Sequence, residues 1–95
     1  MATSNADESE TLVLDGNAVA GLLQAVFGRE MTATPAECAN CGNVAELGAV
    51  LAFTQAPGAV LRCPACKEVM LRIVETPNGF IFEARGTAHF ELPKG

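Results

Sequence analysis

The sequence of 95 residues contains no tryptophan, no tyrosine and a single histidine, His89. It also lacks a basic excess, because eleven acidic side chains outnumber six basic ones and give a net charge of -5. A protein that binds nucleic acid by neutralising phosphates normally carries an excess of positive charge. We therefore expect no general nucleic-acid binding, and we interpret Arg62, Lys67 and Arg72 as solvated strand residues rather than a binding cluster.

Long apolar runs are absent as well. No stretch approaches the roughly 18 to 20 apolar residues of a membrane span. The segment 1–11, MATSNADESET, has neither the basic start nor the apolar core of a signal peptide. It carries three acidic side chains and no large apolar residue after Met1, so we expect a flexible acidic tail. The prediction is a soluble, cytoplasmic protein without a membrane partner.

Groups for acid–base or nucleophilic catalysis are also scarce. His89 has no serine or free cysteine near it in the sequence, and both serines, Ser4 and Ser9, lie in the tail. The glutamates are scattered singly, so no pair of carboxylates suggests a general acid and base. We expect no catalytic residues and no enzyme.

Four cysteines, in contrast, form two Cys-x-x-Cys pairs: Cys38 with Cys41, and Cys63 with Cys66. This spacing lets both thiolates of a pair reach one ion, and two such pairs complete a tetrahedron. Gly42 and Pro64 favour the tight turn, or knuckle, that each pair requires. The 21 residues between Cys41 and Cys63 are enough for one hairpin, which would return the chain beside the first pair. All four cysteines are predicted metal ligands.

Three interpretations of the thiols compete. Structural Zn²⁺ fits best, because four cysteines leave no open coordination position and a domain with a small hydrophobic core needs an additional cross-link for stability. A rubredoxin-like iron site uses the same ligands, and ligand type alone does not separate iron from zinc. Two redox-active disulfides are the third interpretation, which a cytosolic setting disfavours.

The fold class predicted around this site is a small metal-bound α+β domain. One N-terminal helix is expected within residues 12–31, where apolar residues recur at helical spacing, with Asp15 at its start and Gly28 at its end. Residues 36–86 are expected to form a zinc-ribbon domain with four antiparallel strands and rubredoxin-like knuckles. Residues 87–95 are a C-terminal extension.

The predicted helix has an unusual second face. Ala20, Gly21, Ala25 and Gly28 are small rather than charged, and an exposed helix is usually polar on one side. We expect the helix to contact a protein partner or a second copy of the chain.

The segments LDGNAVAGLLQAVFGREMT, CANCG, APGAVLRCPACKEVMLRIV and TPNGFIFEARG together resemble a family of small, uncharacterised actinobacterial zinc-ribbon-like proteins. In that family a short helix precedes a two-knuckle ribbon, and the similarity covers about residues 12–86. The resemblance implies no established activity. Its relatives are often encoded beside a sulfite-oxidase-like molybdopterin enzyme and a flavin-containing ferredoxin reductase. The resemblance therefore implies an oxidoreductase system as a partner and slightly favours iron.

Two functions follow from these observations, with a third as a minor alternative. The first is a non-enzymatic zinc ribbon that acts as a protein-interaction module or accessory subunit. The second is an iron electron carrier between a flavin reductase and an oxidoreductase. The third, contact with nucleic acid or a transcription complex, rests on analogy between folds alone.

Overall fold

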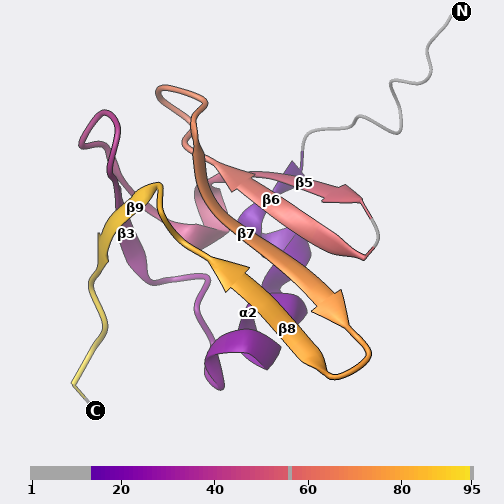
Figure 1. Cartoon of the computed structure of the whole chain (residues 1–95). Coiled ribbons are helices and arrows are strands. Elements are labelled where there is room, and N and C mark those ends of the chain that lie inside the picture. The colour runs from indigo at the N-terminus through magenta and orange to yellow at the C-terminus, as the bar shows by residue number, and fades with distance from the viewer. Residues whose placement is uncertain (1–13, 56, 95) are drawn as a thin grey trace, which may run out of the picture.

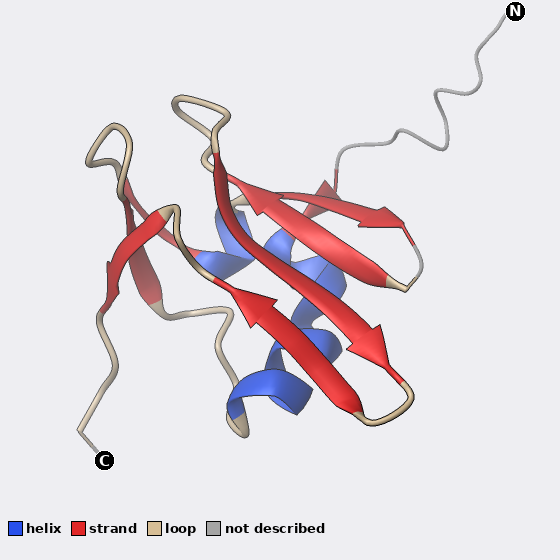
Figure 2. Ribbon diagram, in the orientation of Figure 1, coloured by secondary structure: helices blue, strands red, loops and turns tan. Residues whose placement is uncertain are grey.

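The computed structural model describes residues 14–55 and 57–94 (Figure 1), and the acidic tail predicted for residues 1–11 lies outside them. The described residues form one α-helix, two short 3₁₀ helices and eight strands (Figure 2). All strand pairs are antiparallel. The small α+β class with one helix and antiparallel strands is thereby confirmed. No helix in the described part of the chain is both long and apolar enough to cross a membrane.

The strands form two sheets. The larger has the order β2-β5-β6-β7-β8, with the bounds Leu14–Asp15, Leu51–Gln55, Gly58–Arg62, Val69–Thr76 and Gly79–Glu83. The smaller has the order β4-β3-β9, with the bounds Val44–Glu46, Pro35–Cys38 and Thr87–Phe90. Strands β5 to β8 form a meander of sequential hairpins, whereas β3 pairs with β9 from the far end of the described chain.

The prediction of a four-strand ribbon is wrong, because the described residues contain eight strands. The four predicted strands correspond to β5, β6, β7 and β8. The others, β2, β3, β4 and β9, have two to four residues each, which is too short to display an alternating pattern. Residues 87–90, inside the predicted C-terminal extension, form β9. Residues Leu47–Ala49 form the 3₁₀ helix η2.

The helical segment is shorter than residues 12–31. The 3₁₀ helix η1 (Gly16–Val19) leads into α2 (Ala20–Phe27), because Leu14 and Asp15 pair with β5 as strand β2. Gly28 ends the helix in the left-handed conformation, with φ 75°. Asp15 precedes η1, but its side chain makes no capping hydrogen bond.

The core lies between the helices and the inner face of the large sheet (Figure 2). Leu23 of α2 is fully buried. Phe27 packs edge-to-face against Phe82 of β8 and Phe90 of β9, with ring centroids 5.1 and 5.7 Å apart. The end of the helix therefore contacts both sheets. The other core residues come from η1, η2, β3, β5, β6, β7 and the segments next to them: Val19, Met31, Ala36, Cys38, Leu47, Val50, Ala52, Ala59, Leu61, Cys63, Met70, Leu71 and Ile73.

Candidate metal centre

The four cysteines lie in two turns that lie side by side at one end of the molecule (Figure 1). Cys38 is the last residue of β3, and Cys41 lies in the turn between β3 and β4. Cys63 directly follows β6, and Cys66 lies in the turn before β7. Each sheet therefore contributes one knuckle, and the site lies where the two sheets meet.

The first knuckle is closed by backbone hydrogen bonds. The Cys38 N–H donates to the Asn43 carbonyl at 2.8 Å, and the Gly42 N–H donates to the Cys38 carbonyl at 2.9 Å. The Asn40 N–H points at the Cys38 Sγ, 3.4 Å away. The first two bonds close the turn, and the third directs a backbone N–H dipole toward the sulfur.

The second knuckle repeats the same pattern. The Cys63 N–H donates to the Glu68 carbonyl at 2.9 Å, and the Lys67 N–H donates to the Cys63 carbonyl at 2.8 Å. The Ala65 N–H lies 3.3 Å from the Cys63 Sγ. Two segments of different sequence thus adopt one local geometry, because both must direct two sulfurs toward a common point.

One position in each knuckle needs a positive φ. Gly42 takes φ 81° in the first, and Lys67 takes φ 71° in the second. A left-handed conformation costs a residue with a Cβ about 1 to 2 kcal/mol. At Lys67, hydrogen bonds offset this cost, because its Nζ donates to the Pro64 carbonyl and its own carbonyl accepts from Arg62 Nη1, both at 2.8 Å.

The sulfur geometry matches tetrahedral coordination. The Sγ atoms of Cys38 and Cys66 are 3.6 Å apart, those of Cys41 and Cys63 are 3.7 Å apart, and all four lie within 4.8 Å of one another. A tetrahedron with metal–sulfur bonds of about 2.3 Å has sulfurs about 3.8 Å apart. A disulfide would need about 2.0 Å, and all four cysteines are free. The four side chains can therefore hold one metal ion.

Within each knuckle, the two cysteines differ in burial. Cys38 and Cys63 are buried with 1% and 0% of their surface exposed, whereas Cys41 is exposed and Cys66 is half-buried. The first cysteine of each pair is therefore part of the hydrophobic core, and the second faces the surface.

The thiols also differ in acidity. The Asn40 side chain and the Glu68 N–H lower the pKa of Cys66 to about 6. Desolvation raises the pKa of Cys63, but the N–H groups of Cys66 and Ala65 outweigh it and lower that pKa. The Asn43 N–H lowers the pKa of Cys41, yet desolvation and the three neighbouring sulfurs outweigh it and raise that pKa to about 12. Four thiolates so close together repel one another unless a cation lies between them.

Comparison of the sequence with models of known protein families identifies one family that covers most of the chain. Residues 7–95 match the sequence model of DUF6510, described as a family of unknown function. The chain belongs to this family. No curated protein and no solved structure matches the chain. The DUF6510 description carries no activity, and a cluster of four cysteines is compatible with a zinc-ribbon-like protein.

The connection between β8 and β9 ties the first knuckle to the large sheet. The Ala39 N–H donates to the Gly86 carbonyl at 2.8 Å, and the Thr87 hydroxyl donates to the Met70 carbonyl of β7 at 3.0 Å. A Cβ at Gly86 would lie 1.7 Å from the Val69 carbonyl oxygen. The backbones of β7 and this connection therefore approach too closely for any other residue.

His89 lies on the small sheet, opposite Glu37. Its Nδ1 lies 3.4 Å from the Glu37 carboxylate, and its Nε2 lies 3.5 Å from that of Glu91. The sequence did not indicate the contact with Glu37, since the pairing of β3 with β9 joins residues about 50 apart.

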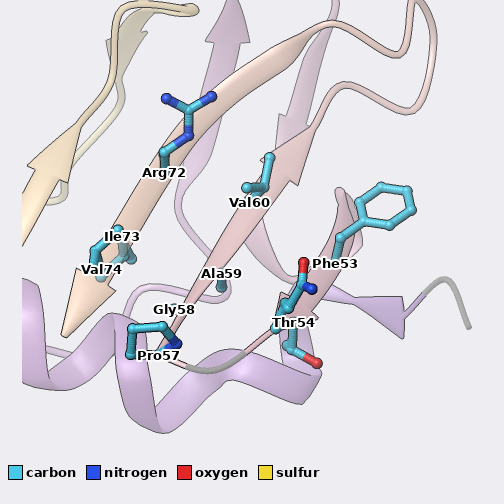
Figure 3. Close-up of a pocket in the computed structure, with 10 residues that line it drawn as sticks. Phe53, Thr54, Pro57, Gly58, Ala59, Val60, Arg72, Ile73 and Val74 are labelled. Carbon is cyan, nitrogen blue, oxygen red and sulfur yellow. The ribbon is translucent and has the colours of Figure 1, made fainter. Parts of the chain in front are cut away.

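One hollow in the described surface lies away from the cysteines, on the large sheet (Figure 3). It has a volume of about 550 Å³, and Phe53, Val60 and Arg72 point out from the same face of the sheet. Arg72, its one charged residue, forms an ion pair with Glu83 at 3.0 Å. Arg62 lies over the Phe53 ring, 5.8 Å from its centroid. The three basic residues noted in the sequence thus each have a partner within the chain.

Proposed function

We propose that the protein is a non-enzymatic zinc-ribbon protein whose structural metal supports a surface for binding another protein. The observation that carries this proposal is the approach of four sulfurs to within 4.8 Å of one another. Four thiolates satisfy Zn²⁺ completely and leave no position for a substrate or a catalytic water. The metal's contribution is therefore to the fold.

The position of the site supports a structural role. Its ligands join β3 of the small sheet to the β6–β7 connection of the large sheet. Two of the ligands, Cys38 and Cys63, belong to the buried core. A metal here would hold two sheets together in a chain whose size limits its hydrophobic core.

The exposed face of α2 supports a role in protein binding. Ala18, Gly21, Gln24 and Ala25 of η1 and α2 are exposed, and none of them is charged. A Cβ at Gly21 would meet nothing within 4 Å, so this face has room for a partner's surface. Leu23 is fully buried and cannot contact a partner.

The experiment uses the zinc-loaded full-length protein as bait in an extract of the cells that make it. We expect Ala25→Arg to abolish retention of the partner, because it places a charged, bulky side chain on the small face. Leu92→Arg is the matched control, since Leu92 is 52% exposed and lies outside the helix. A wild-type bait that retains no protein, or a partner retained equally by Ala25→Arg, would contradict binding through this face.

An iron electron carrier is the second candidate. One observation favours it: Cys41 is exposed and Cys66 half-buried, so two sulfurs of an iron site would offer electrons a route to the surface. Such a carrier would work between a flavin reductase and an oxidoreductase. A colourless protein from iron-replete cells would exclude it. Nucleic-acid binding is the minor alternative, and absence of binding at low salt would end it.

A further inference from the structure

Strand β8 is an open edge of the large sheet and pairs only with β7 among the described strands. Phe80, Ile81 and Phe82 in its centre are 40%, 62% and 39% exposed. Natural edge strands usually carry lysine, proline or a bulge that prevents pairing with another chain. β8 has none of these, because its register with β7 is regular and its only charged residue is Glu83 at its end.

We propose that β8 pairs antiparallel with β8 of a second copy of this chain, so that two five-stranded sheets become one continuous sheet. This inference goes beyond the proposed function, which leaves the partner's identity open and uses the face of α2. Figure 1 shows β8 at the front of the molecule, at the end of the sheet away from β2 and β5.

The backbone of β8 presents hydrogen-bonding groups to the open edge. The Glu75 N–H donates to the Pro57 carbonyl at 2.8 Å, on the β6 side of β7. Because backbone groups alternate sides along a strand, residues 74 and 76 of β7 bond toward β8, through Ile81 and Gly79. The N–H and C=O groups of Phe80 and Phe82 then point away from β7, toward the open edge.

The sequence of β8 is complementary to itself in one register. Antiparallel pairing centred on Ile81 places Phe80 opposite Phe82 of the second copy, and the two Ile81 side chains opposite each other. Phe80 and Phe82 then exchange backbone hydrogen bonds across the two-fold axis, and their rings form cross-strand aromatic pairs. Such an interface uses the same patch on both copies, as a two-fold dimer requires.

The charges in β8 also permit self-pairing. In this register Glu83 lies opposite Gly79 of the second copy, so the two carboxylates do not meet. Within its own chain Glu83 is paired with Arg72 and Arg85, each at 3.0 Å. The chain as a whole carries a net charge of -5, so two copies repel each other at long range. Salt screens this repulsion, and the dimer should strengthen as the salt concentration rises.

The test is sedimentation equilibrium of the zinc-loaded full-length protein across micromolar concentrations and several salt concentrations. We expect a monomer–dimer equilibrium for the wild type. Ile81→Lys should raise the dimer dissociation constant by at least about tenfold, since it places two positive charges opposite each other. Leu92→Lys, at a similarly exposed apolar residue outside the sheets, should leave the constant unchanged. A wild type that stays monomeric, or equal effects of the two variants, would overturn the proposal.

Cross-linking tests the register without relying on a disruptive variant. Side chains directly opposite each other in a pair that is not hydrogen-bonded are close enough for a disulfide. Ile81→Cys in the zinc-loaded protein should therefore form a covalent dimer on mild oxidation, while Leu92→Cys under the same conditions should not. Dimers of Ile81→Cys that resist cross-linking would show that another surface mediates dimerisation.

Discussion

Gly42 and Gly21 have equally open surroundings but opposite backbone requirements. An added Cβ would meet nothing within 4 Å at either position. Gly42 has φ 81°, whereas Gly21 lies inside the α-helix. We expect Gly42→Ala to lower the free energy of unfolding by about 1 kcal/mol, and Gly21→Ala to raise it by about 1 kcal/mol. Urea unfolding of the zinc-loaded proteins measures both.

Because the two substitutions add the same methyl group, they control for each other. Equal effects of the same sign would show that the conformation of the first knuckle does not decide its stability.

At the residue scale, the four metal ligands could be predicted from the sequence, but the positive φ of Lys67 could not. The spacing of Cys38, Cys41, Cys63 and Cys66 predicted a cluster, and the structure brings all four together. Glycine at position 42 signalled a positive φ, but no such signal exists at Lys67, where the same conformation occurs. The hydrogen bond from Arg62, five residues earlier, supports this conformation, but an arginine at that position does not by itself predict a positive φ.

At the scale of elements, the close packing of the connection between β8 and β9 predicts that a substitution at Gly86 destabilises the fold. Gly86→Ala would place a Cβ 1.7 Å from the Val69 carbonyl, so the backbone must shift. The shift would also break the hydrogen bond from Ala39 to Gly86, which links the first knuckle to this connection. We expect a loss of about 2 to 4 kcal/mol in the free energy of unfolding.

Thermal or urea unfolding of the zinc-loaded Gly86→Ala variant measures this loss. Metal content measured on the same sample shows whether the first knuckle is disturbed, in which case the affinity for metal falls as well. A variant as stable as the wild type would mean that the connection does not hold the two sheets together.

The elements found from sequence were those with a visible period. The helical stripe of Leu22, Leu23, Val26 and Phe27 and the alternation in β5 to β8 gave the helix and one meander. The small sheet was not predicted, because β3, β4 and β9 are short and β9 pairs with β3 from about 50 residues away. Its presence explains how Cys38 is held: β3 lies between β4 and β9, with Cys38 at its end.

At the scale of the whole molecule, the metal centre would link two sheets that share a small core. The coordination of structural zinc and folding are thermodynamically coupled, since a preformed site rarely exists in the unfolded chain. Loss of one ligand should therefore destabilise both knuckles rather than one. We expect Cys63→Ser to have the largest effect on stability, because Cys63 is fully buried and the second knuckle's hydrogen bonds converge on it.

The measurement that tests the central claim most directly is the metal content of the untagged wild-type protein by mass spectrometry, with its visible spectrum and Cys63→Ser as the control. We expect one zinc per wild-type chain, no colour and no zinc in Cys63→Ser. A wild type without metal that still unfolds cooperatively would contradict a metal-stapled fold. One iron per chain, with sulfur-to-iron absorption bands that bleach on reduction, would contradict the structural zinc and make the protein an electron carrier.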